Sequence, residues 1–121
     1  MIYYGYPRCS TSRKGEKWLQ ERKVSYEFKD LSKETPSADE LKKWHNASGK
    51  DIKKFFNTSG MKYRELDLKN RLTDMNDEEK YQLLASEGML IKRPMVVDGD
   101  RVLIGFNEKE WEAHFSNGGK A

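Results

Sequence analysis

The first 28 residues change their hydrophobic period twice, and this constrains the fold more than any other feature of the chain. Residues 2–6 are aromatic and β-branched and stop at Pro7, which predicts a short strand. Residues 11–22 have helical spacing, and residues 24–28 then alternate at period two, which predicts a second strand. The chain therefore opens with a strand–helix–strand unit that carries Cys9 in its first loop.

The middle of the chain has the patterns of helices. Residues 37–40 read as a capping box, and the helix that follows is expected to stop at residues 48–49. Residues 51–56 predict a short helix. A further helix is expected over residues 77–88, because acidic side chains fill its first turn and a glycine ends it.

The end of the chain returns to strands. Residues 94–97 are apolar, residues 98–100 are a tight-turn signal, and residues 101–105 are expected to pair back as a hairpin. Asn107 is a suitable N-cap for a closing helix, and residues 116–121 are expected to fray.

The order of these elements is that of an α/β protein with a small mixed sheet, similar to the thioredoxin fold. We expect a single domain over residues 1–121. Its thioredoxin-like core is expected over about residues 1–32 and 91–116, with an all-helical insertion over about residues 33–90.

Composition narrows the classes of partner. Charged residues make up 36% of the chain and the net charge is only +3, with acids and bases interleaved, so we expect no direct nucleic-acid binding. No apolar run approaches the length of a membrane span. A single cysteine and the lack of an export signal favour the cytoplasm, and we expect a monomer without a bound metal or cofactor.

Cys9 lies where a helix N-terminus favours a thiolate. Free backbone N–H groups and the positive end of the helix dipole lower the pKa of a thiol in this position. Ser10, Thr11 and Ser12 are good N-cap residues whose hydroxyls can donate to a sulfur anion or an oxyanion, and Arg13 adds positive potential. This setting predicts a nucleophilic thiolate, and the alternative is a small buried hydrophobic residue.

Ser12 stands where a two-cysteine motif would carry its resolving cysteine. An intramolecular disulfide is therefore excluded, and an oxidised form of Cys9 is a sulfenate or a mixed disulfide with another molecule.

Arg93 and Pro94 open the first strand of the C-terminal hairpin. In thioredoxin-like folds a cis-proline at this position packs beside the redox cysteine, so we expect Pro94 to be cis and Arg93 to project toward Cys9. The alternatives are that Pro94 is an ordinary trans proline at a strand edge and that Arg93 is a base on the surface.

The remaining candidates have simpler interpretations. His45 and His114 lack metal-ligand spacing and are expected on the surface or on a helix face. The three tryptophans are expected in the core. A basic run is expected to be a solvated face or a docking surface for an acidic partner; it comprises Lys53, Lys54, Lys62, Arg64, Lys69 and Arg71.

Three motifs together resemble the ArsC/Spx family, which includes glutaredoxin-coupled arsenate reductases and Spx-type transcription regulators. They are Tyr-x-x-Pro-x-Cys-x-Thr-Ser-Arg over residues 4–13, Lys-Arg-Pro-Met-Val-Val over residues 92–97 and Gly-Phe-Asn-Glu over residues 105–108. The resemblance implies a thioredoxin-like core with a helical insertion, Cys9 as the redox residue and a cis Pro94.

The chain departs from the arsenate reductase pattern. The resemblance implies three arginines around the oxyanion, of which Arg93 matches while Asn57 and Gly105 stand at the other two positions. The histidine that helps to lower the pKa of the cysteine in those enzymes falls at Gly5. We therefore do not expect efficient arsenate reduction.

Two functions remain open. The first is a thiol-dependent oxidoreductase in which Cys9, Ser12 and Arg93 act on a disulfide or oxyanion and glutathione or glutaredoxin restores the thiol. The second is a non-catalytic Spx-type regulator that binds the C-terminal domain of the RNA polymerase α subunit near Gly49, Lys50 and Lys53.

Overall fold

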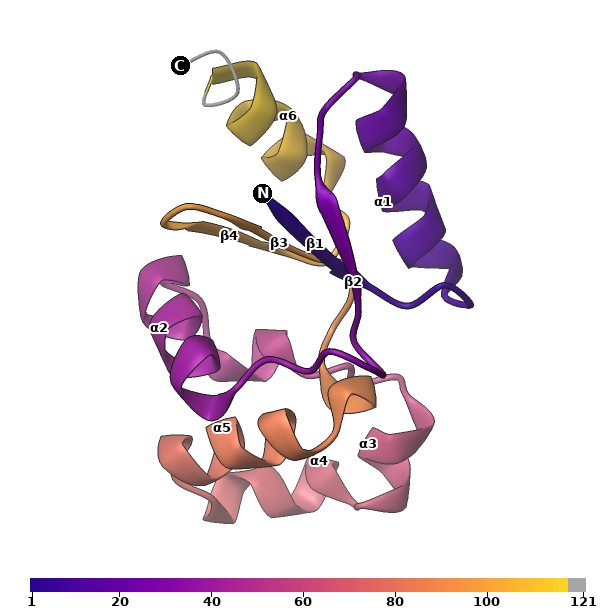
Figure 1. The fold of residues 1–121 in the computed structure, drawn as a ribbon. Helices are drawn as coiled ribbons and strands as arrows, with labels where there is room; N and C mark the ends of the chain where they lie inside the picture. The colour runs from indigo at the N-terminus through magenta and orange to yellow at the C-terminus, as the bar shows by residue number, and fades with distance from the viewer. Residues whose placement is uncertain (118–121) are drawn as a thin grey trace.

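In the computed structural model, which describes residues 1–117, a four-stranded mixed sheet separates two groups of helices (Figure 1). The strands are β1 (Ile2–Gly5), β2 (Glu27–Asp30), β3 (Met95–Asp98) and β4 (Arg101–Ile104). The α-helices are α1 (Ser10–Glu21), α2 (Ala38–Ser48), α3 (Met61–Glu65), α4 (Leu68–Arg71), α5 (Asp77–Ser86) and α6 (Glu108–Asn117). Three short 3₁₀ helices are η1 (Ile52–Phe55), η2 (Leu72–Asp74) and η3 (Gly88–Leu90).

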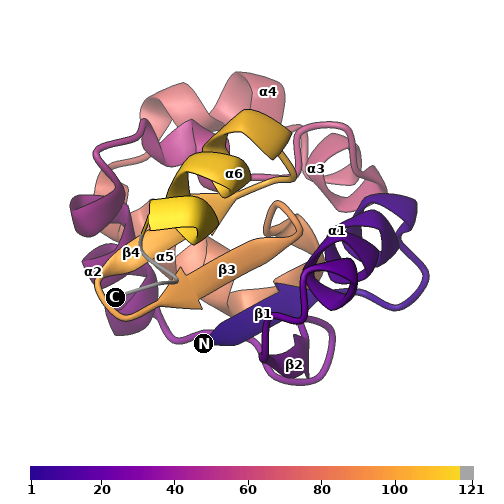
Figure 2. The ribbon, with the colours of Figure 1, turned by 90° about the horizontal axis from the view of Figure 1, so that it is seen from above.

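The sheet has the order β2-β1-β3-β4, in which β1 and β2 are parallel and the other neighbours are antiparallel. Helices α1 and α6 cover one face, and α2 and the other helices between β2 and β3 cover the opposite face (Figures 1 and 2). This confirms the predicted thioredoxin-like sheet with helices inserted in its middle.

Strand register sorts side chains onto the two faces. Tyr3, Val96 and Leu103 are paired neighbours and face α1 and α6, where they pack with Trp18 and Trp111. Because side chains alternate along a strand, the adjacent residues point to the other face.

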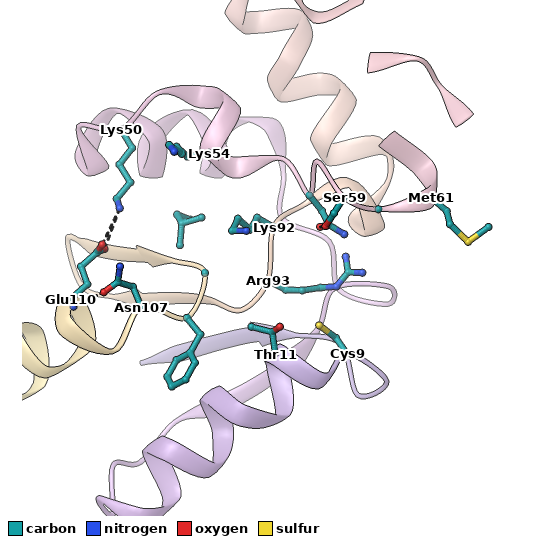
Figure 3. A pocket seen from close by; sticks show the side chains of 15 residues that line it. Cys9, Thr11, Lys50, Lys54, Ser59, Met61, Lys92, Arg93, Asn107 and Glu110 are labelled. Carbon is teal, nitrogen blue, oxygen red and sulfur yellow. Dashed lines mark hydrogen bonds and ion pairs between the residues drawn. The ribbon is translucent and has the colours of Figure 1, made fainter. Parts of the chain in front are cut away.

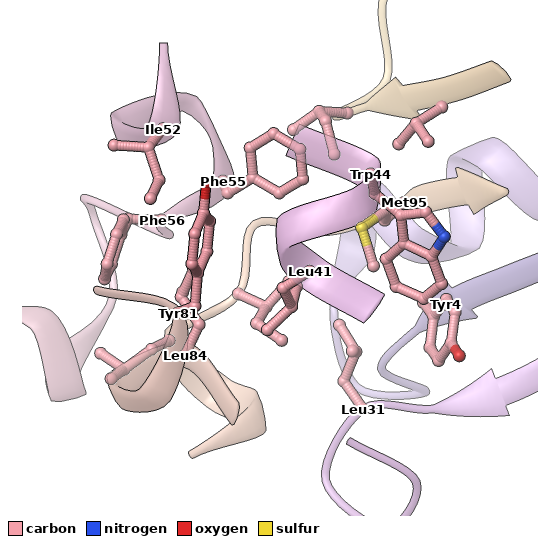
Figure 4. Packing of buried hydrophobic residues seen from close by; sticks show 14 of the residues in the cluster. Tyr4, Leu31, Leu41, Trp44, Ile52, Phe55, Phe56, Tyr81, Leu84 and Met95 are labelled. Carbon is pink, nitrogen blue, oxygen red and sulfur yellow. The ribbon is translucent and has the colours of Figure 1, made fainter. Parts of the chain in front are cut away.

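The larger cluster joins the sheet to the inserted helices. Figure 4 shows Leu41 and Trp44 of α2 packed near Tyr4 and Met95, with Leu84 of α5 beyond them. The core prediction for the tryptophans is confirmed, since Trp18, Trp44 and Trp111 are 5%, 7% and 0% exposed.

The predicted boundaries of the second strand were wrong. Residues 24–26 precede the ladder, which begins where Glu27 pairs with Ile2, the first residue of β1. The alternation itself is present, because Val24, Tyr26 and Phe28 are half-buried and the residues between them are exposed. Tyr26 donates to Glu16 of α1 at 2.7 Å, so this extended segment packs on a helix before it joins the sheet.

The predicted ends of α2 and the predicted start of α6 agree with the structure, while α5 ends at Ser86, two residues before the predicted stop. The capping box at Ser37 and Glu40 is formed, and Gly49 ends α2 in the left-handed conformation with φ 67°. Asn107 caps α6 by accepting from the Glu110 N–H at 3.0 Å. Ser116 and Asn117 belong to α6 instead of fraying, and residues 118–121 lie outside the described part of the chain.

Helices α3 and α4 were not predicted. Neither helix has a side-chain cap at its start, and Leu66 and Asp67 separate them. Asp67 has a φ of 53°, so the segment lacks the regular period of a longer helix. Tertiary burial of Tyr63 and Leu68 stabilises them. No helix within the described residues is long and apolar enough to cross a membrane.

Candidate functional site

A groove of about 710 Å³ lies between the sheet and the inserted helices (Figure 3). It is formed where α1 begins, where β3 begins and where β4 ends, facing the segment from Lys50 to Met61. Its lining residues are Cys9, Thr11, Lys50, Lys54, Asn57, Ser59, Gly60, Met61, Lys92, Arg93, Ile104, Gly105, Phe106, Asn107 and Glu110. Residues far apart in the sequence thus surround the single cysteine.

Cys9 occupies the N-cap position of α1. Its own N–H donates to the Tyr6 carbonyl at 2.9 Å, and its carbonyl accepts from the Arg13 N–H at 3.1 Å. The turn between β1 and α1 therefore holds the half-buried sulfur in front of the first free N–H groups of a 12-residue helix. This position contradicts the alternative of a fully buried core cysteine.

Opposing effects set the pKa of the Cys9 thiol. Burial raises this pKa, while the Ser12 N–H and hydroxyl, the Thr11 N–H and the Arg93 guanidinium lower it, so that it lies below the ordinary value. The Ser12 hydroxyl also accepts from the Tyr6 N–H at 3.1 Å, which leaves its proton free to donate.

Arg93 is held by backbone groups of the insertion. Its Nη1 donates to the Met89 carbonyl at 3.1 Å and the Ile91 carbonyl at 3.4 Å, and the guanidinium lies 5.6 Å from the centre of the Tyr6 ring. The Arg93–Pro94 bond is cis, as predicted. Figure 3 shows the sulfur of Cys9 facing Arg93 and Thr11, so Arg93 is more than a surface base.

The prediction that Ser10, Thr11 or Ser12 caps α1 was wrong. The three residues proposed as N-caps lie inside the first turn, and no side chain caps the helix. Ser12 is 1% exposed and bonds to Tyr6, whereas Thr11 lines the groove. Ser10 and Arg13 do not line the groove, and Arg13 donates to the Pro7 carbonyl at 3.2 Å.

The groove contains basic residues that the sequence did not place beside Cys9. Lys50, Lys54 and Lys92 join Arg93 in its lining, and Lys50 pairs with Glu110 at 3.2 Å. Lys54 is the only member of the predicted basic run in this lining, and the other members are exposed elsewhere. The only sequence feature that indicated the position of Lys92 was that this residue directly precedes Arg93.

Asn57 and Gly105 also line the groove. These are the two positions at which the resemblance to arsenate reductases implies further arginines. The groove consequently holds one guanidinium, that of Arg93, among the described residues.

The two histidines lie outside this lining. His114 is 6% exposed and bonds to Asp98 at 2.8 Å, so of the two expected positions the surface was wrong and the helix face, on the buried side of α6, was right. His45 bonds to Tyr81 at 2.6 Å. Within residues 1–117, no three His, Cys, Asp or Glu side chains are grouped as metal ligands.

The fold and this groove define a thioredoxin-like protein with one cysteine at a helix N-terminus. The chain belongs to the ArsC family, whose sequence model matches residues 4–114. It is 48% identical over 116 residues to the protein YusI of Bacillus subtilis, covering 96% of this chain and 98% of that protein.

Two further comparisons indicate the breadth of the family. The structure of an ArsC-family related protein from Bacteroides fragilis has a TM-score of 0.90 and 46% identity, covering 93% of this chain and 94% of that one. The regulatory protein MgsR of Bacillus subtilis is 29% identical over 110 residues, covering 91% of this chain and 86% of that protein.

Proposed function

We propose that this chain is a thiol-dependent oxidoreductase whose nucleophile is the Cys9 thiolate. The observation that carries the proposal is the half-buried Cys9 sulfur in an open groove, with its pKa lowered by Ser12, Thr11 and Arg93. A lowered pKa increases the fraction of thiolate at a given pH, and the open groove makes the sulfur accessible to a substrate.

The reaction is thiol–disulfide exchange. The Cys9 thiolate attacks one sulfur of a disulfide, a Cys9–sulfur bond forms, and the original S–S bond breaks. The departing sulfur takes the electron pair and accepts a proton from water. A glutathione thiolate, or a glutaredoxin, then attacks the mixed disulfide and releases the Cys9 thiolate.

Ser12 and Arg93 have different roles in this proposal. Ser12 and the helix N-terminus stabilise the thiolate before attack and after release. Arg93 holds the anionic part of the substrate, for which its position beside Cys9 and its anchored guanidinium are suited. No bound cofactor takes part, and glutathione is the co-substrate.

Efficient arsenate reduction is not part of this proposal. Asn57 and Gly105 bring no charge to the groove, so an arsenate oxyanion would meet one guanidinium only. Each absent guanidinium removes a charge-assisted hydrogen bond worth roughly 1.5–3 kcal/mol.

The test compares Cys9-dependent turnover on two substrates in the presence of glutathione. We expect turnover of a glutathione mixed disulfide, at most slow turnover of arsenate, and loss of both in Cys9→Ser. Ser10→Ala is the matched control, because Ser10 is exposed and outside the groove lining. Equal turnover by wild type and Cys9→Ser contradicts the oxidoreductase proposal.

The regulator remains a second candidate because MgsR is a regulatory relative. We propose in this case that the chain binds the C-terminal domain of the RNA polymerase α subunit at the exposed end of α2. Gly49 is open there, since a Cβ added to it would meet nothing within 4 Å, and Lys50 and Lys53 adjoin it.

Co-purification with that polymerase domain separates the two candidates. Binding that persists in Cys9→Ala and is lost in Gly49→Arg, together with absence of reductase turnover, favours the regulator. Turnover without binding favours the oxidoreductase.

A further inference from the structure

Basic side chains outnumber carboxylates in the lining of the groove. Four basic side chains and one carboxylate line it, and Lys50 pairs with that carboxylate, Glu110. Among residues 1–117, neither Lys54 nor Lys92 forms a salt bridge. The side of the groove that these two lysines form therefore carries two positive charges that are not paired in a salt bridge, and Asp51 is the one carboxylate residue that lines an adjoining hollow with them.

The position of Lys92 is fixed by two contacts. Its backbone N–H donates to the Phe55 carbonyl at 2.8 Å, and its stem lies over Gly105, where an added Cβ would come within 2.9 Å of the Lys92 Cε. Gly105 has a φ of 75° and no side chain, so the lysine stem occupies the space that a larger residue would fill.

Lys54 lies on the neighbouring wall. It belongs to η1, and its N–H donates to the Asp51 carbonyl at 2.9 Å. Lys54 and Lys92 also line a second hollow together, of about 330 Å³, so the two side chains border the same space in both cavities. Figure 3 shows both on the far side of Arg93 from Cys9.

We propose that Lys54 and Lys92 form an anion subsite that selects, as the reaction partner of Cys9, a small thiol or disulfide bearing two carboxylates. This inference rests on the proposed oxidoreductase function and adds the residues that set its specificity. Arg93 binds the negative group nearer the sulfur, and the lysine pair binds the group farther from it.

The size and charge of the groove support a small anionic partner. A volume of about 710 Å³ is in the range of sites for small molecules. Its unpaired cations attract the carboxylates of an anionic partner and repel a cationic disulfide, and lysine ammonium groups act as point charges that donate to carboxylates in several orientations.

The first experiment measures the rate at which reduced protein forms a mixed disulfide, by intact mass. The probes are glutathione disulfide, which is anionic, and 2-hydroxyethyl disulfide, which is neutral. We expect the K54Q/K92Q variant to react roughly threefold to tenfold more slowly with the anionic probe and within about twofold of wild type with the neutral one, since two screened charges are lost.

The matched control removes the same charge elsewhere. Lys17 and Lys43 are exposed and outside the groove lining, so K17Q/K43Q should keep the wild-type preference for the anionic probe. Equal slowing in the two double variants, or no slowing in K54Q/K92Q, overturns the subsite.

A second measurement is independent of thiol chemistry. S-methylglutathione carries both carboxylates but cannot exchange, and its binding is measured by calorimetry. We expect weaker binding, by roughly threefold to tenfold, in K54Q/K92Q than in K17Q/K43Q. Equal affinities, or no binding by wild type, overturn the subsite.

The two proposals fail in different ways. If Cys9 reacts with the neutral probe no faster than a free thiol does, the oxidoreductase proposal fails, and the binding of S-methylglutathione alone decides the subsite. If Cys9 reacts rapidly with both probes and the lysine variant makes no difference, the oxidoreductase proposal stands and the subsite fails.

Discussion

At the scale of single residues, Ser12 links the loop that carries Cys9 to the sheet. Its carbonyl accepts from the Tyr3 hydroxyl at 2.6 Å, and its own hydroxyl accepts from the Tyr6 N–H at 3.1 Å. These contacts fix the first turn of α1 on β1, and the same hydroxyl lowers the pKa of Cys9. One buried serine thus both positions the helix and stabilises the thiolate.

The pH profile of Cys9 alkylation tests this role. Because the folded-state pKa lies below the ordinary value, the alkylation rate should remain high as pH falls through about 8.5 and decrease only at the lower folded-state pKa. In Ser12→Ala the profile should move to higher pH, since a hydrogen bond to the thiolate is lost.

Ser10→Ala serves as the control, because Ser10 is exposed in the same turn. An unchanged profile in Ser12→Ala, or an equal movement in Ser10→Ala, contradicts the role of the Ser12 hydroxyl.

At the scale of elements, local capping signals gave the starts of α2 and α6, whereas no side chain caps α1. The boxes at Ser37 and Asn76 each satisfy two backbone N–H groups with side chains three residues apart, so the signal is complete within one turn. The start of β2 depended instead on where Glu27 meets Ile2, a contact between segments 25 residues apart in the chain.

The capping box of α2 is expected to contribute measurably to stability. Ser37→Ala removes the side chain that accepts from the Glu40 N–H at 3.1 Å, and the free energy of unfolding should fall by about 1 kcal/mol. Urea denaturation measures the change.

Asn46→Ala is the control on the exposed face of the same helix. It should leave stability within about 0.5 kcal/mol of wild type or increase it slightly. Equal losses in the two variants would show that the box contributes nothing specific.

At the scale of the whole molecule, the sheet is shared by two hydrophobic clusters. Tyr4 packs with the inserted helices, while Tyr3, the adjacent residue, packs with α1 and α6. Because strand neighbours face opposite sides, neither cluster is independent of the other. We therefore expect the insertion and the thioredoxin-like core to unfold together.

Leu84→Ala tests this cooperativity from the insertion side. Leu84 is fully buried in α5, and its truncation should lower the free energy of unfolding by about 2–5 kcal/mol. Tryptophan fluorescence, which reports partly on Trp18 and Trp111, and far-UV circular dichroism should show one coincident transition.

Gln82→Ala on the exposed face of α5 should change stability by less than about 0.5 kcal/mol. Separate fluorescence and dichroism transitions in Leu84→Ala would indicate that the two parts unfold independently.

The order of the four strands and of α1, α2, α5 and α6, the caps of α2 and α6 and the place of Cys9 at a helix start could be read from the sequence, because each depends on residues within a few positions of one another. The burial of His114 and the approach of Lys54 and Lys92 to the groove were set by the tertiary structure. These features join segments that are distant in the chain, and packing across the sheet brings them together. The place of Cys9 at a helix start was thus predictable, whereas the charge that surrounds it was set by the fold.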